Sequence, residues 1–343
     1  MRPLQRKFGK VCYRLLVVFA WLCVLVFFGW AVGALYHLTS VPYALRILLS
    51  LAYLAGGVAL FFWIPKLANW LSVVAGSIVV VYLATMTQQP RNDRHWVIEQ
   101  QRMPHIDRNS THVTIENLRH AVYRSETDFD VHYRDLEFRL GDLQSVWFVV
   151  QKFSTLEGLA HTFISFELDS PTGPQYFCVS VEVRREVDEV YSPIRGLYRQ
   201  FEVMYVVADE RDVIGVRTVM RPDDRVHMYR VNATPERVQR LFLDIADRIN
   251  GLEDQPEFYH TLLKNCTNEI VRHTYKLTLE PINWLDPRIV MPGFSGRFAH
   301  SQRLIGAADQ SFAELQEQCR IDQVAREVGL EGDFSNRIRE SQR

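Results

Sequence analysis

The first ninety residues of this 343-residue chain contain no aspartate and no glutamate. Their basic residues are few, and five of them precede Leu15: Arg2, Arg6, Lys7, Lys10 and Arg14, followed by Arg46 and Lys66. Because the whole chain has a formal net charge of −1, subtracting this +7 leaves −8 for residues 91–343. An acidic remainder argues against nucleic-acid binding, which uses clustered Lys and Arg to neutralise phosphates.

Cysteine is also scarce, and its spacing excludes several kinds of site. The five cysteines are Cys12, Cys23, Cys178, Cys266 and Cys319. They form no disulfide framework, and the spacing gives no support to a Cys178–Cys319 bridge. No Cys or His spacing typical of zinc, no nucleotide-binding Gly-rich loop and no Gly-x-Ser-x-Gly elbow is present. We therefore expect neither a metal nor a cofactor.

Three long apolar runs fill the N-terminal part of the chain. They cover residues 15–37, 43–64 and 67–86, with turns marked by Pro42 and Pro65. About 20 apolar residues are needed for a helix to cross a bilayer. The first run is too long for a cleaved signal peptide and lacks an Ala-x-Ala site. We predict a membrane anchor over residues 1–90 with three transmembrane helices.

The basic residues predict the orientation of this anchor. Those before the first run, and Lys66 between the second and third runs, belong in the cytoplasm by the positive-inside rule. Three crossings then place residues 91–343 on the opposite face, which is the periplasm if the anchor lies in a bacterial inner membrane. If the third run does not cross, the same rule puts the domain in the cytoplasm.

From residue 91 onward the pattern indicates a globular α+β domain. Tyr176–Arg184 alternates apolar and polar side chains, as a half-buried strand does. A helix is expected from Thr234-Pro235 to Asn250-Gly251, and a second helix from Asn265. Residues 301–343 are charged and helix-prone, and we interpret them as a peripheral tail that either packs on the domain or frays. The full set of expected strands is 112–118, 145–150, 161–168, 176–184, 201–207, 213–219 and 226–231.

Cys266 is the candidate nucleophile. Asn265 is a suitable N-cap, which places Cys266 in the first turn of the expected helix. The helix dipole there lowers a thiol pKa, and unpaired backbone N–H groups can bind an oxyanion. The alternative is a cysteine that is only a small buried apolar residue.

A thiolate nucleophile needs a histidine base that is oriented by a third polar group. His161 opens an expected strand directly after a Gly158-containing turn, so we expect it to face the start of the helix. Glu182 and Ser180, on the polar face of the next strand, are the candidates for orienting the imidazole. The alternatives are that His161 is a surface histidine and that Glu182 pairs with Arg184 or Arg185 on a solvated face.

Several ordered motifs resemble the bacterial family named for the N-terminal periplasmic domain of the lipoprotein N-acyltransferase Lnb. The resemblance spans roughly residues 91–300, the expected catalytic domain. The motifs are Asn92-Asp93-Arg94-His95-Trp96, Tyr123-Arg124-Ser125-Glu126-Thr127-Asp128, His161-Thr162-Phe163-Ile164-Ser165-Phe166, Ser180-Val181-Glu182-Val183-Arg184, Ala208-Asp209-Glu210-Arg211-Asp212-Val213, Pro256-Glu257-Phe258-Tyr259 and Asn265-Cys266-Thr267.

The resemblance implies transfer of an acyl chain from a phospholipid to the N-terminal amine of a lipoprotein. The order His161, polar strand residue, Asn265-Cys266 also resembles the circularly permuted papain-like enzymes of the lecithin–retinol acyltransferase type, which implies an antiparallel-sheet domain. Those enzymes carry Asn-Cys-Glu, whereas Thr267 stands at the third position here. Both resemblances make Cys266 the nucleophile and His161 the base. Asn265 and Ser180 are our candidates for the oxyanion-binding and orienting residues.

We therefore expect a membrane-bound cysteine acyltransferase, with a phospholipid donor and a lipoprotein acceptor. One alternative keeps the site but lets water accept the acyl group, as in a periplasmic cysteine peptidase or amidase that acts on cell-wall peptide. Another is an envelope scaffold without enzymatic activity, in which Cys266 is merely packed.

Overall fold

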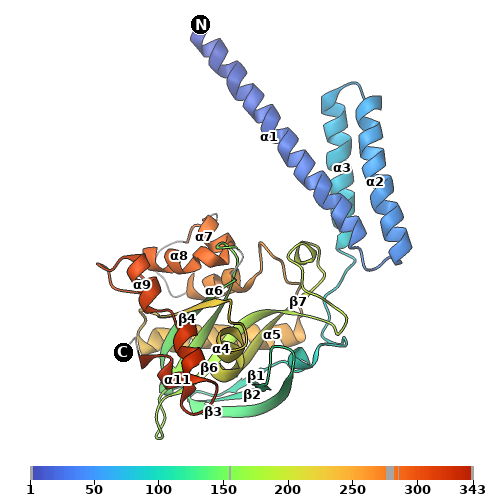
Figure 1. Ribbon diagram of the computed structural model, residues 1–343. Helices are drawn as coiled ribbons and strands as arrows, with labels where there is room; N and C mark the ends of the chain where they lie inside the picture. The colour runs from blue at the N-terminus through green and yellow to red at the C-terminus, as the bar shows by residue number, and fades with distance from the viewer. Residues whose placement is uncertain (1–2, 154–155, 276–281, 285, 341–343) are drawn as a thin grey trace. The chain divides into compact units, whose positions relative to one another are not determined.

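The computed structural model describes residues 3–153, 156–275, 282–284 and 286–340 (Figure 1). The chain divides into two compact units. The helical unit comprises residues 1–90 together with Ser192–Gln200, and the sheet domain comprises Arg91–Tyr191 and Phe201–Arg343. The helical unit is therefore built from two separate segments of the chain.

Three apolar helices form the helical unit: α1 (Pro3–Tyr36), α2 (Tyr43–Trp63) and α3 (Leu67–Thr85). The segments long and apolar enough to cross a membrane are Arg14–Tyr36, Tyr43–Trp63 and Ala68–Thr85, which agree closely with the three expected runs. Helices α1 and α2 approach closely at Gly57, where a Cβ would lie 2.4 Å from the ring of Phe28. Most of their large apolar side chains face outward, as lipid-facing side chains do.

The segment Ser192–Gln200 packs on α1 within the helical unit and contains a short 3₁₀ turn, η3 (Arg195–Leu197). The ring of Tyr198 stacks on His37 with centroids 4.9 Å apart, and it also lies against Trp30. A Cβ at Gly33 would lie only 2.3 Å from the Tyr198 hydroxyl. Gly33 is therefore required for this aromatic residue to reach α1.

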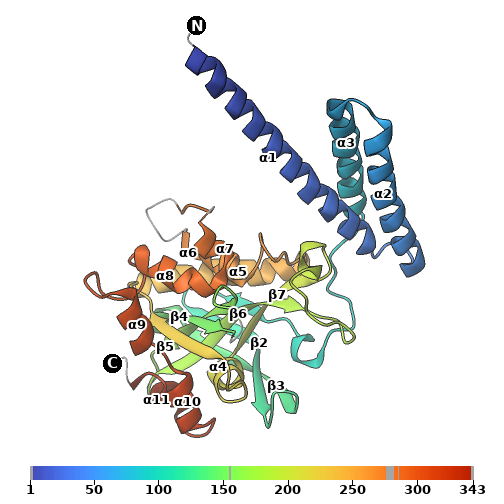
Figure 2. The ribbon, with the colours of Figure 1, turned by 45° about the horizontal axis from the view of Figure 1, so that its top comes forward.

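An eight-stranded sheet forms the centre of the sheet domain (Figures 1 and 2). The strand order is β1-β2-β7-β6-β5-β4-β8, with β3 paired to β2 outside this path. All pairs are antiparallel except β2 and β7, which are parallel at Arg119 and Ala208. The strands are β1 (His105–Arg108), β2 (His112–Tyr123), β3 (Phe129–Arg139), β4 (Leu143–Lys152), β5 (Ala160–Leu168), β6 (Gln175–Arg184), β7 (Glu202–Asp209) and β8 (Arg225–Arg230).

Six of the seven expected strands are confirmed, as β2, β4, β5, β6, β7 and β8. The seventh, at 213–219, is wrong: this segment belongs to helix α4 (Glu210–Thr218). Asp209 caps α4 by accepting a hydrogen bond from the Arg211 N–H at 2.9 Å. Nearly all of α4 is buried, so its apolar residues show no helical stripe, and periodicity alone cannot distinguish a buried helix from a strand.

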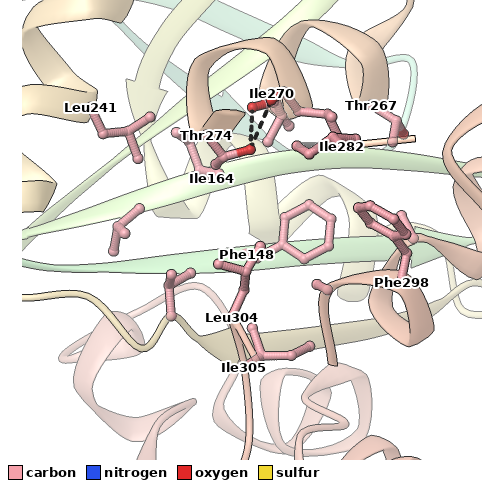
Figure 3. Close-up of a pocket in the computed structure, with 15 residues that line it drawn as sticks. Phe148, Ile164, Leu241, Thr267, Ile270, Thr274, Ile282, Phe298, Leu304 and Ile305 are labelled. Atoms are coloured by element: carbon pink, nitrogen blue, oxygen red, sulfur yellow. Dashed lines mark hydrogen bonds between the residues drawn. The ribbon is translucent and has the colours of Figure 1, made fainter. Parts of the chain in front are cut away.

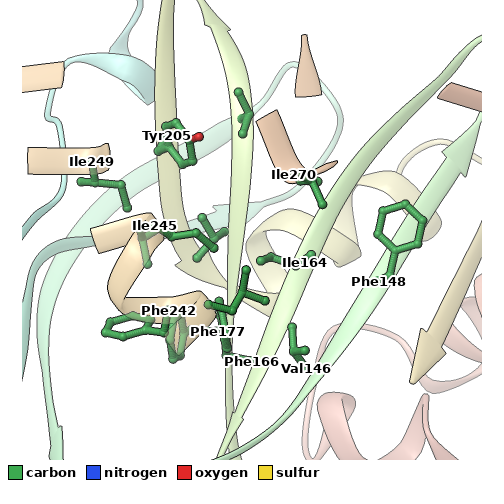
Figure 4. Close-up of a cluster of buried hydrophobic side chains, with 14 of the residues drawn as sticks. Val146, Phe148, Ile164, Phe166, Phe177, Tyr205, Phe242, Ile245, Ile249 and Ile270 are labelled. Carbon is green, nitrogen blue, oxygen red and sulfur yellow. The ribbon is translucent and has the colours of Figure 1, made fainter. Parts of the chain in front are cut away.

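Helix α5 (Pro235–Asp254) begins at the expected residue but continues through Asn250-Gly251. The expected end is wrong because the Asn250 side chain bonds the backbone N–H and C=O of Ile106, both at 2.9 Å, instead of ending the helix. The apolar face of α5 packs on one face of the sheet, where Phe242 meets the rings of Phe166 and Phe177 (Figure 4).

The remaining helices follow α5 along the chain. They are α6 (Cys266–Tyr275), α7 (Pro287–Val290), α8 (Ser295–Ser301), α9 (Phe312–Gln318), α10 (Asp322–Val328) and α11 (Phe334–Arg337). Short 3₁₀ turns lie at η1 (Ile98–Gln100), η2 (Leu140–Asp142) and η4 (Pro292–Phe294). The expected helix at Asn265 is thus present as α6.

The tail is not peripheral, contrary to our interpretation of its charge. Ile321, Phe334 and Ile338 are fully buried in a core on the second face of the sheet, together with Val213 of α4. Arg339 forms a fully buried ion pair with Glu210 at the start of α4. The domain is α+β, as expected, with both sheet faces covered.

Candidate active site

Cys266 is the first residue of α6. Asn265 caps this helix, since its Oδ1 accepts the Asn268 N–H at 2.9 Å while its Nδ2 donates to the Thr261 carbonyl at 2.8 Å. The Cys266 residue is only 6% exposed. The first-turn N–H groups of a helix have no intrahelical partner. The Asn265 amide is occupied by the cap, the Asn268 N–H is bound by that cap, and the Glu269 N–H bonds the Asn265 carbonyl. The backbone N–H groups of Cys266 and Thr267 are therefore the candidate oxyanion donors.

His161 is the second residue of β5, and the register of this strand places it beside Glu182. Phe163 pairs with Ser180 in the antiparallel β5–β6 ladder. Two residues before Phe163 and two residues after Ser180, the same register places His161 opposite Glu182. The Nε2 of His161 lies 2.7 Å from Ser180 Oγ and 3.2 Å from Glu182 Oε1. The ring and the Cys266 thiol are close enough to shift each other's pKa. Because Nε2 is engaged by Ser180 and Glu182, Nδ1 is the ring nitrogen that remains for the thiol.

The three groups shift one another's pKa values. Burial lowers the pKa of His161, but the charges of Glu182 and Cys266 outweigh burial and raise this pKa to about 9. Burial raises the pKa of Cys266, but the charge and hydrogen bond of His161 lower it to about 7. Burial likewise raises the pKa of Glu182, and His161 and Arg217 hold it well below its ordinary value. The site therefore favours a thiolate beside an imidazolium.

Arg217 of α4 is a site residue that the sequence did not indicate. Its Nη2 donates to Glu182 Oε1 at 2.9 Å and its Nη1 to the Val213 carbonyl at 2.9 Å. The only feature of the sequence that could have drawn attention to Arg217 was its place in an apolar segment, and we interpreted that segment as a strand.

The alternative partners of Glu182 are engaged elsewhere. Arg184 lies over the Trp96 ring, 4.3 Å from its centroid, and Arg185 donates to Glu99 at 3.0 Å. Glu182 therefore belongs to the His161 site rather than to a solvated ion pair on β6.

A cleft opens over these groups. Aromatic side chains form part of its wall, and three arginines, Arg185, Arg217 and Arg221, form another part. The lining residues are Gln100, Gln151, Phe153, Ala160, His161, Val181, Glu182, Val183, Arg185, Tyr191, Arg217, Arg221, Tyr259 and Cys266. A substrate group that enters the cleft thus meets the thiol and the imidazole together.

A separate apolar pocket lies beside the first turns of α6 (Figure 3). It is lined by Thr267 and Ile270 of α6 and by Ile164 and Phe148 of the sheet. A hydrogen bond of 3.0 Å joins Thr267 to Thr162 at its edge, and neither Cys266 nor His161 lines it. Its volume is about 70 Å³.

Other histidines of the sheet domain lie in separate contacts. His273 bridges Asp244 and Tyr205, with both contacts at 2.7 Å, and His105 bonds Glu253 at 2.8 Å. Within the described part of the chain, no group of three or more His, Cys, Asp or Glu is arranged to hold a metal ion.

Comparison with known families agrees with the resemblance read from the motifs. Residues 129–286 match the family model described as the Lnb N-terminal periplasmic domain. The match includes His161, Glu182, Arg217 and Cys266. No curated protein and no solved structure matches the chain. The circularly permuted papain-like relationship stays a prediction. A periplasmic domain family together with three apolar helices indicates a membrane protein with a periplasmic domain.

Proposed function

We propose that this protein is a membrane-bound cysteine acyltransferase of the bacterial inner membrane. It moves an acyl chain from a phospholipid to the N-terminal amine of a lipoprotein through a thioester on Cys266. The observation that carries the proposal is the Cys266–His161–Glu182 arrangement, in which the thiol pKa is lowered to about 7. The matched periplasmic family and the three apolar helices support a substrate that resides in a membrane.

In the first half-reaction the Cys266 thiolate attacks the ester carbonyl of the phospholipid. The N–H groups of the first turn of α6 stabilise the oxyanion. The acyl C–O bond then breaks, and the imidazolium of His161 gives its proton to the departing alkoxide. The products are an acyl thioester on Cys266, a lysophospholipid and a neutral His161.

The second half-reaction returns the site to its starting state. A neutral amine attacks the thioester carbonyl, and His161 takes the proton that the nitrogen loses. The C–S bond breaks, which leaves an amide on the acceptor and restores the thiolate beside the imidazolium. Glu182 keeps its position throughout and orients the ring through Nε2.

The test is to trap the thioester. Purified full-length protein in vesicles with a phospholipid labelled in its acyl chain, and without an amine acceptor, should accumulate label on Cys266 that neutral hydroxylamine releases. Cys266→Ser should abolish this label, because a serine hydroxyl has a far higher pKa than a thiol. Cys319→Ser, at another buried cysteine, should retain it. Label that persists in Cys266→Ser would overturn the proposal.

The same thiol, imidazole and carboxylate also suit a peptidase or amidase, in which water accepts the acyl group. Repeating the trapping experiment with a labelled cell-wall peptide beside the phospholipid separates the two functions. A peptidyl rather than a fatty acyl thioester on Cys266 would assign the site to cell-wall peptide and exclude phospholipid as the donor.

A further inference from the structure

Exposed apolar side chains gather on the loops around the Cys266 cleft. The first group, here called lip one, consists of Phe153, Leu156 and Leu159 from the β4–β5 connection and of Met291. Leu156 is 60% exposed. A Cβ at Gly158 would lie 2.5 Å from Met291 Cε, and Gly293 donates to the Gly158 carbonyl at 3.1 Å, so the two loops are packed together.

A second group, lip two, consists of Val190, Tyr191, Leu262 and Leu263. Val190 is 76% exposed and Leu263 68% exposed. The rings of Tyr191 and Tyr259 are 6.4 Å apart, and Tyr191 also forms a hydrogen bond with Thr261, next to Leu262. These contacts join the loop before β7 to the loop before Cys266.

The cleft lies between the two lips. Phe153 of lip one and Tyr191 of lip two both line it, together with Cys266. Apolar side chains that gather on a surface in this way mark an interaction site rather than the scattered exposure that is normal for soluble proteins. Here each group contributes one residue to the wall of the cleft that holds the nucleophile.

We propose that the two lips insert into the surface of a phospholipid bilayer, so that the Cys266 cleft opens toward the lipid. The inference rests on the proposed function, because it concerns how the phospholipid donor reaches the thiol. The lips come from separate loops around an opening, a shape suited to a deformable lipid surface. Tyr191 is joined directly to Ser192, the first residue of the segment that belongs to the apolar helical unit.

Bilayer contact has a chemical consequence for the donor. The ester of a membrane phospholipid lies below the headgroup, and an enzyme that stays in water must pull the lipid out before attack. Apolar side chains of membrane-surface segments bury themselves in the interface between headgroups and acyl chains. If the lips do the same, the phospholipid can reach the cleft without first being extracted into water. A short, water-soluble ester reaches the cleft from solution. Acyl labelling of Cys266 should therefore depend on the lips when the donor is a bilayer phospholipid, and not when it is a soluble ester.

The test uses full-length protein in vesicles of phosphatidylethanolamine and phosphatidylglycerol. The variant Leu156→Asp/Leu263→Asp places one charge on each lip at an exposed position. We expect acyl labelling of Cys266 from a bilayer phospholipid to fall roughly tenfold or more. Labelling from p-nitrophenyl butyrate should be unchanged. Val122→Asp, at an exposed apolar position of β2 that belongs to neither lip, is the matched control and should affect neither reaction.

A second measurement does not depend on activity. Tryptophan placed at Leu263 should gain fluorescence that is quenched by lipids brominated on their acyl chains, relative to the unmodified protein. Absence of quenching overturns the bilayer contact. So does equal loss of labelling from both donors in the Asp variant, which indicates damage to the site, or loss from neither donor.

Two other outcomes are distinguishable. If the Asp variant converts a dimer to a monomer and leaves labelling from the bilayer donor unchanged, the lips bind a second copy and the inference is wrong. If the unmodified protein is labelled by neither donor while Leu263→Trp is quenched, the proposed function fails and the bilayer contact stands.

Discussion

Arg217 anchors the carboxylate of Glu182 by donating to Oε1, the oxygen that also lies 3.2 Å from the imidazole Nε2 of His161. One oxygen therefore joins the base to a guanidinium that is itself fixed to the backbone of α4. The carboxylate cannot rotate away from the ring without losing both contacts. The position of the base thus depends on a helix that contributes no residue to the bond-making step.

Replacing Glu182 with Gln should leave the fold intact and reduce turnover by roughly 10- to 100-fold, the scale of losing a charged supporting hydrogen bond. The pKa of His161 should fall at the same time, because the charge of Glu182 raises it. Steady-state rates across pH would measure both effects. An unchanged rate would return Glu182 to a purely structural role and make Ser180 the orienting group.

Arg217→Lys keeps the positive charge but replaces the two nitrogens that donate separately to Glu182 and to the Val213 carbonyl with a single ammonium nitrogen. We expect a turnover loss of roughly tenfold with little change in KM, since the effect reaches substrate only through the position of His161. Arg211→Lys, at a half-buried position of the same helix whose guanidinium donates to the Gly332 carbonyl rather than to Glu182, is the control and should keep the turnover of the unmodified protein. A change confined to KM would instead place Arg217 in contact with the substrate.

Alkylation of Cys266 by iodoacetamide should rise with pH through a midpoint near 7, where its thiol ionises. Up to about pH 9 the thiolate faces a protonated His161. In His161→Ala the midpoint should move above the ordinary cysteine value of about 8.5, because burial then acts without a compensating cation. Mass spectrometry of the Cys266 peptide gives the rates. An unshifted midpoint would mean that His161 does not set the thiol pKa.

Removing the side chain of Arg339 leaves Glu210 buried without its ion-pair partner. We expect Arg339→Ala to destabilise the domain by about 3–5 kcal/mol. Arg337→Ala, two residues earlier and exposed, should change stability by less than about 0.5 kcal/mol. Thermal unfolding in detergent compares the two. Equal melting temperatures would show that residues 301–343 are not part of the fold's cooperative unit.

Membrane topology can be tested independently of activity. Alkaline phosphatase fused after residue 343 should be active in a Gram-negative host, because this enzyme folds only outside the cytoplasm and three crossings export the domain. A silent phosphatase fusion, with an active cytoplasmic reporter at the same site, would show that one of the three helices does not cross.

The parts of the fold that were predictable are those with a periodic or capping signal. Tyr176–Arg184 alternates and is β6, and Asn265 is a capping residue that does begin α6. The β1 and β3 strands escaped prediction because β3 is largely exposed and β1 has only four residues.

For the site, Cys266 and His161 could be selected because a helix start and a strand end are recognisable in the sequence. Arg217 could not, because it reaches Glu182 only after α4 folds onto the sheet. The wrong strand prediction at 213–219 and the missed Arg217 therefore have one cause. Long-range packing determines both the helical state of this segment and the contact of Arg217 with Glu182, and local periodicity carries no information about such packing.

The buried contact between Glu210 and Arg339 joins residues 129 positions apart in the chain. Helix α4, and with it Arg217, therefore receives its final packing only after almost the whole sheet domain has been synthesised and exported. Contacts of such long range slow folding, because the entropy of closing a long loop opposes them. A chain that has not finished folding has a cysteine but no oriented base, so its Cys266 thiol keeps an ordinary pKa of about 8.5 until the domain is complete.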